Sequence, residues 1–127
     1  MEISKGPFSG VDRCPEFDKD LKRLSKKYPS LPEDINTFIK TALNGLHKLG
    51  QEIHGIVQVV GLGVEEPKVY KALKFACKSL KGRGAASGMR VVYAYKKESD
   101  EIYLIEIYFK ADKENEDRDR IGRVLKG

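Results

Sequence analysis

The sequence predicts an α+β protein, in which an N-terminal helical hairpin packs on a small twisted antiparallel β-sheet and a short helix ends the chain. Apolar residues recur at helical spacing in the first 50 residues. β-branched and aromatic residues dominate the later segments 89–95 and 101–110. Helices that come first and paired strands that follow are typical of an antiparallel sheet with its helices on one face.

The first helix is expected to open at Cys14-Pro15-Glu16, because proline is tolerated in the first helical turn. Its apolar stripe consists of Phe17, Leu21, Leu24 and Tyr28, and Pro29 ends it. The second helix begins with Ser30 and Glu33, spaced as a capping box, and ends at Gly50. Two helices joined by a turn that contains proline predict an antiparallel helical hairpin.

The segment after the hairpin favours a strand over 56–60, followed by a turn at Gly61-Leu62-Gly63. This turn lacks the third glycine of a phosphate loop, so we do not assign a nucleotide site to it. Residues 67–80 fit two periods. A helical stripe runs through Val69, Leu73, Ala76 and Leu80, whereas a strand would alternate lysines with apolar residues.

Segments 89–95 and 101–110 are predicted to form a hairpin across the polar link 96–100. In the second strand, alternation places Tyr103, Ile105, Ile107 and Phe109 together on the core face. Asp112 is expected to cap a last helix, whose apolar side consists of Ile121, Val124 and Leu125.

Length and composition predict one domain over residues 1–127, with enough chain for a core of its own. No segment approaches the roughly 20 apolar residues that span a bilayer, and the N-terminus lacks the apolar run of a secretory signal. We therefore expect a cytoplasmic protein without a membrane partner. Two cysteines and two histidines at unrelated spacings make no metal set, and we predict no cofactor: Cys14, Cys77, His47 and His54.

The net charge of +5 is unevenly distributed. Residues 67–97 contain nine basic residues and no acidic one, so the remainder of the chain carries −4, and 98–119 is rich in acids. The basic residues are Lys68, Lys71, Lys74, Lys78, Lys81, Arg83, Arg90, Lys96 and Lys97. Such a division steers a polyanion toward the basic segment, although it also suits a solvated surface that keeps a small protein soluble.

Several local strings, taken in order, resemble the RelE/ParE superfamily of type II toxins, and its RelE-like branch in particular. The matching strings run Leu21-Lys22-Arg23-Leu24-Ser25-Lys26-Lys27-Tyr28-Pro29-Ser30, Val69-Tyr70-Lys71, Gly82 through Tyr93, and Ile107-Tyr108-Phe109-Lys110-Ala111-Asp112. The resemblance covers most of the chain from about Phe17 onward. It implies a strand rather than a helix over 69–77.

The resemblance also implies a function: a metal-independent endoribonuclease that cuts mRNA on the ribosome and is held inactive by a cognate antitoxin protein. It places Arg90, Lys71 and Lys110 at the catalytic positions. Arg90 would clamp the phosphate or, alternatively, pair with Glu106, and Glu106 would act as a base or only neutralise Arg90. The lysines would transfer protons or remain ordinary exposed ammonium groups.

The other basic residues and two tyrosines are assigned to RNA binding: Lys74, Lys78, Lys81, Arg83, Tyr93 and Tyr108. The tyrosines are alternatively part of the core. The chain departs from the family pattern at Leu73, Ala86 and Met89, and residues 113–127 contain no tyrosine or histidine. The alternative function is therefore a non-catalytic protein, either a ParE-like inhibitor of a DNA-handling enzyme or a degenerate toxin that only binds an antitoxin.

Overall fold

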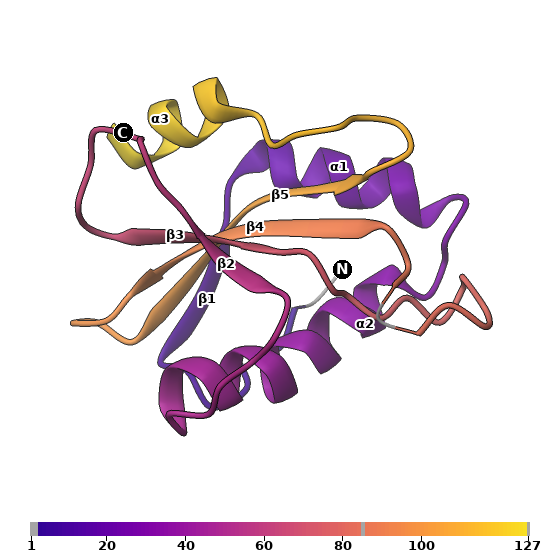
Figure 1. The fold of residues 1–127 in the computed structure, drawn as a ribbon, viewed down its shortest axis with the longest axis horizontal. Coiled ribbons are helices and arrows are strands. Elements are labelled where there is room, and N and C mark those ends of the chain that lie inside the picture. The colour runs from indigo at the N-terminus through magenta and orange to yellow at the C-terminus, as the bar shows by residue number, and fades with distance from the viewer. Residues whose placement is uncertain (1–2, 85, 127) are drawn as a thin grey trace.

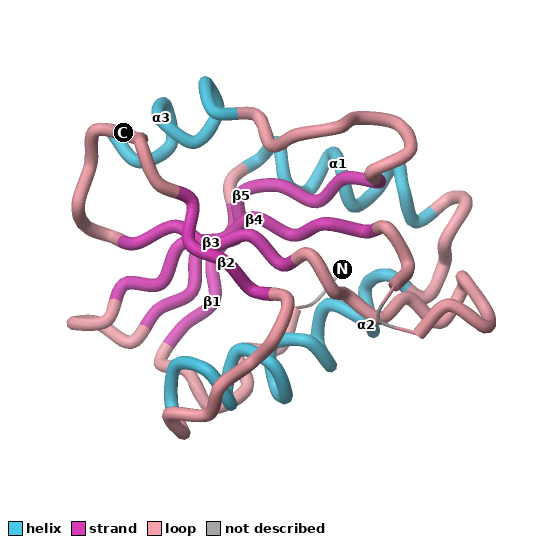
Figure 2. The backbone as a smooth tube through the Cα atoms, viewed as in Figure 1, coloured by secondary structure: helices cyan, strands magenta, loops and turns pink. Residues whose placement is uncertain are grey.

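A five-stranded sheet forms the middle layer of the fold, with helices on both of its faces (Figure 1; Figure 2). The computed structural model describes residues 3–84 and 86–126. The strands are β1 (Gly10–Arg13), β2 (Ile56–Val59), β3 (Lys68–Ala72), β4 (Met89–Lys96) and β5 (Glu101–Phe109). The helices are α1 (Pro15–Ser25), α2 (Leu31–Phe38), η1 (Ile39–Lys48) and α3 (Arg118–Lys126). The predicted α+β class is confirmed.

The sheet is mixed rather than purely antiparallel, which corrects the prediction. Its strand order is β1-β5-β4-β3-β2, and β1 pairs with β5 in parallel, with Gly10 opposite Glu101. The other neighbours are antiparallel, as expected. A strand as short as β1 has no periodic pattern that would reveal its partner 91 residues away.

The helical hairpin is confirmed, and one apolar side of it packs on the sheet. Phe17, Leu21 and Leu24 of α1 and Leu31, Ile35 and Leu43 of the second arm are buried. The second arm is α-helical up to Phe38 and π-helical through η1. Figure 1 shows this arm on the opposite side of the sheet from α3.

The predicted capping box is absent from the start of α2. The Ser30 hydroxyl donates to the carboxylate of Asp34 at 2.6 Å and accepts from the Ser79 amide at 2.8 Å. Glu33 pairs with Lys78 instead of returning to Ser30. The loop that follows β3 therefore takes both groups that the capping box would have used.

The segment 67–80 starts as a strand and does not form the alternative helix. β3 covers its first part and ends at Ala72, so the predicted strand over 69–77 is five residues shorter than expected at its C-terminal end. The described residues from 73 to 84 and from 86 to 88 are irregular. It is tied down by a single bridge between Phe75 and Ala86 and by the Ser87 hydroxyl, which donates to the Phe75 carbonyl at 2.5 Å.

A bulge in the β4–β5 hairpin divides the single core face predicted for the second strand between the two sides of the sheet. Val92 pairs with Glu106 but Tyr93 pairs with Leu104, so Ile105 has no partner. Residues before and after Ile105 therefore change sides relative to simple alternation. Ile107 faces the hairpin helices, whereas Ile105 lies on the other side of the sheet.

The two faces of the sheet carry separate cores. The hairpin face, covered by α1, α2 and η1, carries Tyr70, Ala72, Met89, Val91, Tyr93, Leu104 and Ile107. The C-terminal face, covered by α3 and the segment 110–117, carries Val69, Lys71, Arg90, Val92, Ala94, Glu106 and Tyr108. Ile121 of α3 is fully buried in the second core. The prediction that all helices lie on one face is therefore wrong.

The last helix begins at Arg118 and not after Asp112. Its cap is Asp117, whose carboxylate accepts from the Arg120 amide at 3.0 Å. Asp112 lies in the turn that follows β5, where its amide donates to the Phe109 carbonyl at 2.9 Å. Over the residues that the structure describes, no helix has the length and apolar character needed to cross a bilayer.

Candidate nucleic-acid interface

Two of the three predicted catalytic cations share the C-terminal face of the sheet. One cross-strand row consists of Lys71 on β3, Val92 on β4 and Glu106 on β5. Arg90 precedes Val92 by two residues on β4, so it lies on the same face, where it is opposite Tyr108 of β5. The pleat of the sheet therefore brings a lysine, an arginine and a carboxylate from three strands to one surface.

Arg90 does not form the ion pair with Glu106 that is the alternative to its predicted role as a phosphate clamp. Its guanidinium donates to the Leu73 carbonyl at 2.7 Å, and among the described residues it makes no ion pair. This bond uses one of the five donors of the guanidinium. The half-buried side chain therefore keeps donors that can bind an anion.

Lys71 is paired within the structure. Its ammonium lies 2.6 Å from the carboxylate of Glu116, and the two side chains are 18% and 7% exposed. Burial is the largest single influence on the pKa of Glu116 and raises it, but the hydrogen bond from Lys71, a backbone hydrogen bond and the charges of Lys71 and Arg118 together outweigh burial, so this pKa lies below its ordinary value. Lys71 is thus a cation whose positive charge is already compensated.

Glu106 is also occupied. It is 1% exposed, it pairs with Lys113, and one of its oxygens accepts from the Asp117 amide at 2.8 Å. The ammonium of Lys113 lies 5.3 Å from the centre of the Tyr108 ring. The segment 110–117 therefore lies against the candidate surface and compensates the charges of Lys71 and Glu106.

The third predicted catalytic residue stands apart from this cluster. Lys110 is exposed, one residue beyond β5, and its amide donates to the Gly88 carbonyl at 2.8 Å. No contact of its ammonium with Lys71 or Arg90 is found among the described residues. Lys110 thus marks the edge of the surface rather than its centre.

The predicted RNA-backbone contacts lie mostly on the irregular segment after β3. Lys74, Lys81 and Arg83 are exposed there. Lys78 is exposed too, but its ammonium lies 2.7 Å from the carboxylate of Glu33. Three of the four cations are therefore open to solvent without an acidic partner in the described part of the chain.

The prediction that Tyr93 stacks on a base is wrong. Its side chain is fully buried on the hairpin face, with the hydroxyl 2.8 Å from the imidazole of His47. Burial, more than the neighbouring Tyr70, raises the pKa of Tyr93 above its ordinary value. A base cannot reach this ring.

Tyr108 is inaccessible as well. It lies on the C-terminal face but is only 3% exposed, and its hydroxyl has no hydrogen-bond partner among the residues that the structure describes. Burial, followed by the carboxylates of Glu116 and Glu106, raises the pKa of Tyr108 to about 12. It is a neutral phenol beneath the covering segment, and stacking on RNA is not possible in this arrangement.

The acids that cover the surface were not identified from the sequence. Glu116 and Asp117 lie in the charged stretch where the sequence predicts the start of the last helix, after Asp112, and helical pattern alone assigns them no role at the surface. The signal that pointed to them was the charge division itself, since an acid-rich stretch follows the acid-free basic segment. Opposite charges of this kind in one small domain indicate internal pairing as readily as an external polyanion.

The described residues contain no group of three or more histidine, cysteine or acidic side chains that could hold a metal ion.

No protein-family model matches the chain, and no curated protein matches it.

Two solved structures with a similar path of the chain are both RelE proteins. One is the archaeal RelE–RelB complex from Pyrococcus horikoshii, with 13% identity over 79% of this chain and 92% of that chain, and a TM-score of 0.46. The other is a mutant of the E. coli toxin RelE in the free state. Its identity is 15% over 94% of this chain and 96% of that chain, and its TM-score is 0.45.

Proposed function

We propose that this chain is the toxin of a type II toxin–antitoxin pair and cleaves mRNA without a metal. The observation that carries the proposal is the placement of Arg90 and Lys71 on one face of the sheet, next to Glu106. The resemblance of the sequence strings to the RelE-like branch agrees with this placement. A polyanionic substrate also suits a basic segment without acids.

In the proposed reaction, the ribose 2′-oxygen forms a bond to the adjacent phosphorus while the bond from phosphorus to the 5′-oxygen breaks. The 2′-hydroxyl loses a proton and the departing 5′-oxygen gains one, so the products are a 2′,3′-cyclic phosphate and a 5′-hydroxyl. The free donors of Arg90 bind the charge that develops on the phosphorane, a contribution of about 3–4 kcal/mol for a well-placed donor.

Lys71 acts on the same phosphate once its bond to Glu116 is exchanged for one to RNA. Both partners of that exchange are anions, so the ammonium keeps a charge-assisted hydrogen bond throughout. Glu106 is the carboxylate within this row of the sheet and takes the 2′-proton when Lys113 moves away. Lys110 and the exposed cations after β3 hold the RNA backbone, so that affinity falls with salt.

The proposed partners follow from this activity. They are a cognate antitoxin protein and mRNA engaged on the ribosome, and the proposed location is the cytoplasm.

The test is to express the chain alone in a bacterium, follow growth, and map the 5′ ends of mRNA. The expected result is growth arrest with new 5′ ends, and loss of both in Arg90→Ala. Arg83→Ala, which removes an exposed arginine from the same basic segment, is the matched control and should retain cleavage, with binding weakened a few-fold at most. Thermal unfolding of the purified variants establishes that both are folded.

A non-catalytic function is the second candidate, and the pairing of Lys71 with Glu116 favours it. A site that no longer binds RNA does not need a free cation, so an internal carboxylate can neutralise Lys71 without loss of function. In the same experiment, arrest with intact mRNA supports a ParE-like inhibitor of a DNA-handling enzyme. A folded protein that changes neither growth nor mRNA supports a chain that only binds an antitoxin.

A further inference from the structure

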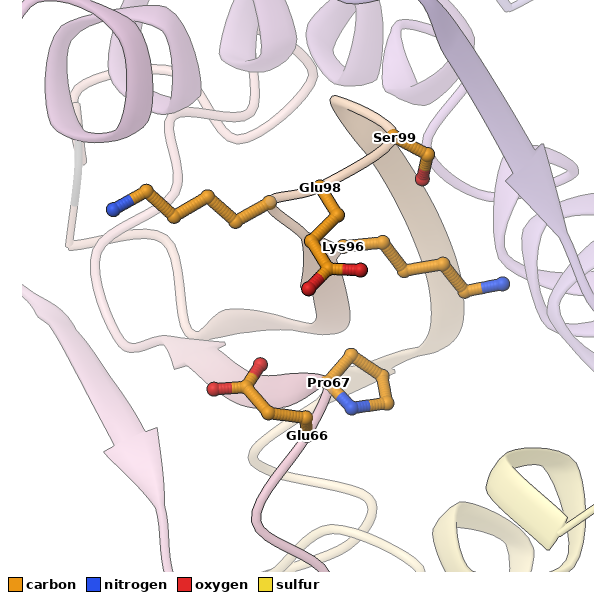
Figure 3. A pocket seen from close by; sticks show the side chains of 6 residues that line it. Glu66, Pro67, Lys96, Glu98 and Ser99 are labelled. Atoms are coloured by element: carbon orange, nitrogen blue, oxygen red, sulfur yellow. The ribbon is translucent and has the colours of Figure 1, made fainter.

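The hairpin face is hollowed at the end of the sheet where β3 begins and β4 ends. One hollow of about 350 Å³ is lined by Leu46, His47, Glu66, Lys68, Tyr70, Tyr95 and Lys97. An adjoining hollow of about 500 Å³, drawn in Figure 3, shares Glu66 and Lys97 with it. The smaller hollow is lined by Tyr70 and Tyr95, on the opposite face of the sheet from Lys71 and Arg90, so it belongs to a different site.

The inner wall of the smaller hollow is aromatic. The His47 ring comes from η1 and lies 4.9 Å from the ring of Tyr70 and 4.4 Å from that of Tyr95, between ring centres. Tyr70 in turn stacks on the buried ring of Tyr93, with 5.4 Å between the ring centres. Burial lowers the pKa of His47 to about 4, so the imidazole is neutral at pH 7. The wall is therefore an uncharged aromatic surface.

The rim of the same hollow carries two lysines that are not neutralised. Lys68 lies directly opposite Tyr95 in the pairing of β3 with β4, and Lys97 follows the end of β4. Both are exposed, and neither has an acidic partner in the described part of the chain. This distinguishes them from Lys71 and Lys113, whose charges are met by carboxylates. The rim is suited to an anion.

One carboxylate and one hydroxyl complete the lining. Glu66 borders both hollows, and Figure 3 shows its side chain across the larger hollow from Glu98. The Tyr70 hydroxyl has no hydrogen-bond partner among the described residues. Burial first and Glu66 second raise its pKa, so it is a neutral donor at pH 7. Glu66 accepts hydrogen bonds and Tyr70 donates or accepts one.

We propose that this hollow binds a nucleotide, with the base against His47, Tyr70 and Tyr95 and the phosphate between Lys68 and Lys97. A volume of about 350 Å³ falls within the range of small-molecule sites. Stacking on aromatic rings suits any base, at about 1–3 kcal/mol per base. Glu66 accepts from an exocyclic amine or a ribose hydroxyl. A cationic ligand would instead meet two unpaired ammonium groups.

The nucleotide has two possible sources, a free mononucleotide or one unit of an RNA strand, and the test separates them. The full chain carrying Arg90→Ala is titrated with AMP, adenosine, inorganic phosphate and a six-residue oligoadenylate, while NMR follows the tyrosine and histidine ring signals. This background has lost the proposed cleavage, so the result does not depend on the proposed function. AMP is expected to shift the signals of His47, Tyr70 and Tyr95, with a Kd below about 1 mM.

Adenosine and phosphate, which each supply half of the ligand, should bind at least about tenfold more weakly than AMP. Adding Lys68→Ala and Lys97→Ala together should weaken AMP about tenfold, since each removes one exposed charge contact. Lys22→Ala, an exposed lysine on α1, is the control and should leave the Kd unchanged. Binding of the oligoadenylate without AMP would assign the site to an RNA strand. No ring shifts with either probe, or equal affinity in the double-lysine variant, would overturn the proposal.

Discussion

Glu116 places a carboxylate where the proposed function needs a phosphate. Its oxygen lies 2.6 Å from the ammonium of Lys71, and both side chains are largely buried. RNA must therefore compete with a tethered anion for this cation. We expect Glu116→Gln to strengthen RNA binding about threefold to tenfold, because the amide keeps the shape of the side chain but removes the competing charge.

Fluorescence anisotropy with a labelled RNA, in the Arg90→Ala background, measures this change. Glu114→Gln is the matched control, since Glu114 is an exposed acid of the same segment with no partner among the described residues. If both variants gain affinity equally, the effect is one of net charge and the pairing with Lys71 is irrelevant to binding.

His47 makes the stability of the protein depend on pH. Burial lowers its pKa from 6.5 to about 4 in the folded chain, whereas the unfolded chain keeps the ordinary value. Between these two values the unfolded state binds more protons, so the free energy of unfolding rises with pH in this window. Acidification from pH 7 to pH 4 should cost roughly 1–2 kcal/mol through this residue, an amount reduced because the ring is only half-buried.

Urea denaturation at pH 7 and pH 4.5, compared between the wild type and His47→Phe, isolates this contribution. The variant loses the hydrogen bond to Tyr93, so its stability at pH 7 is lower. Its dependence on pH should nevertheless be shallower than that of the wild type. An equally steep dependence would mean that other groups cause the loss in acid.

At the scale of the elements, Gly88 sets the start of β4 two residues before Arg90. Its φ is +88°, and a Cβ there would lie 3.0 Å from the Phe109 ring. Gly88→Ala therefore combines backbone strain with a clash, and we expect a loss of about 2–3 kcal/mol. Gly122→Ala in α3 is the contrasting change, because a Cβ there meets nothing within 4 Å. It should stabilise the protein by about 0.5–1 kcal/mol.

Thermal unfolding of the two alanine variants measures both effects, and we expect a lower stability for Gly88→Ala and a higher one for Gly122→Ala. A stabilising Gly88→Ala would show that the φ at this position relaxes easily, and Arg90 would then not be held by the turn that precedes it.

Elements with strong local signals were predictable from the sequence, and those set by long-range pairing were not. The helical hairpin follows from its apolar stripes, and the β4–β5 hairpin from its β-branched and aromatic residues. The bulge at Ile105 has no local signature, yet it exchanges the faces of the residues around it. Tyr93 is not affected by this bulge: β4 alternates regularly, so Tyr93 lies on the face opposite Arg90, in the core, and not at the predicted RNA surface.

The candidate site was predicted only in part for a related reason. Lys71 and Arg90 were identified by their family positions, and the pleat of the sheet does bring them to one face. The ion pair of Lys71 with Glu116 and the hydrogen bond from Arg90 to the Leu73 carbonyl depend on how the segment 110–117 and the loop after β3 fold back. Such contacts between distant parts of the chain leave no periodic trace in a single sequence.

At the scale of the whole molecule, one ion pair fastens the last helix to the first across the edge of the sheet. The guanidinium of Arg120 lies 2.6 Å from the carboxylate of Asp20, with both side chains nearly buried, and also donates to the Ile105 carbonyl at 3.0 Å. Arg123 of α3 reaches Glu16 of α1 at 2.5 Å as well, but this pair is more exposed. The two pairs differ mainly in burial.

Because the pair of Arg120 with Asp20 is the more buried one, we expect it to contribute more than the pair of Arg123 with Glu16 to holding α3 and the segment before it over the C-terminal face. Arg120→Ala leaves Asp20 buried without its partner, and we expect a loss of about 2–4 kcal/mol with faster amide exchange across 118–126. Arg123→Ala should cost less than about 1 kcal/mol and leave the exchange unchanged. Urea denaturation and hydrogen exchange measure both. Equal losses in the two variants would mean that α3 is held by the burial of Ile121 alone, and the surface around Lys71 would then not depend on this ion pair for its cover.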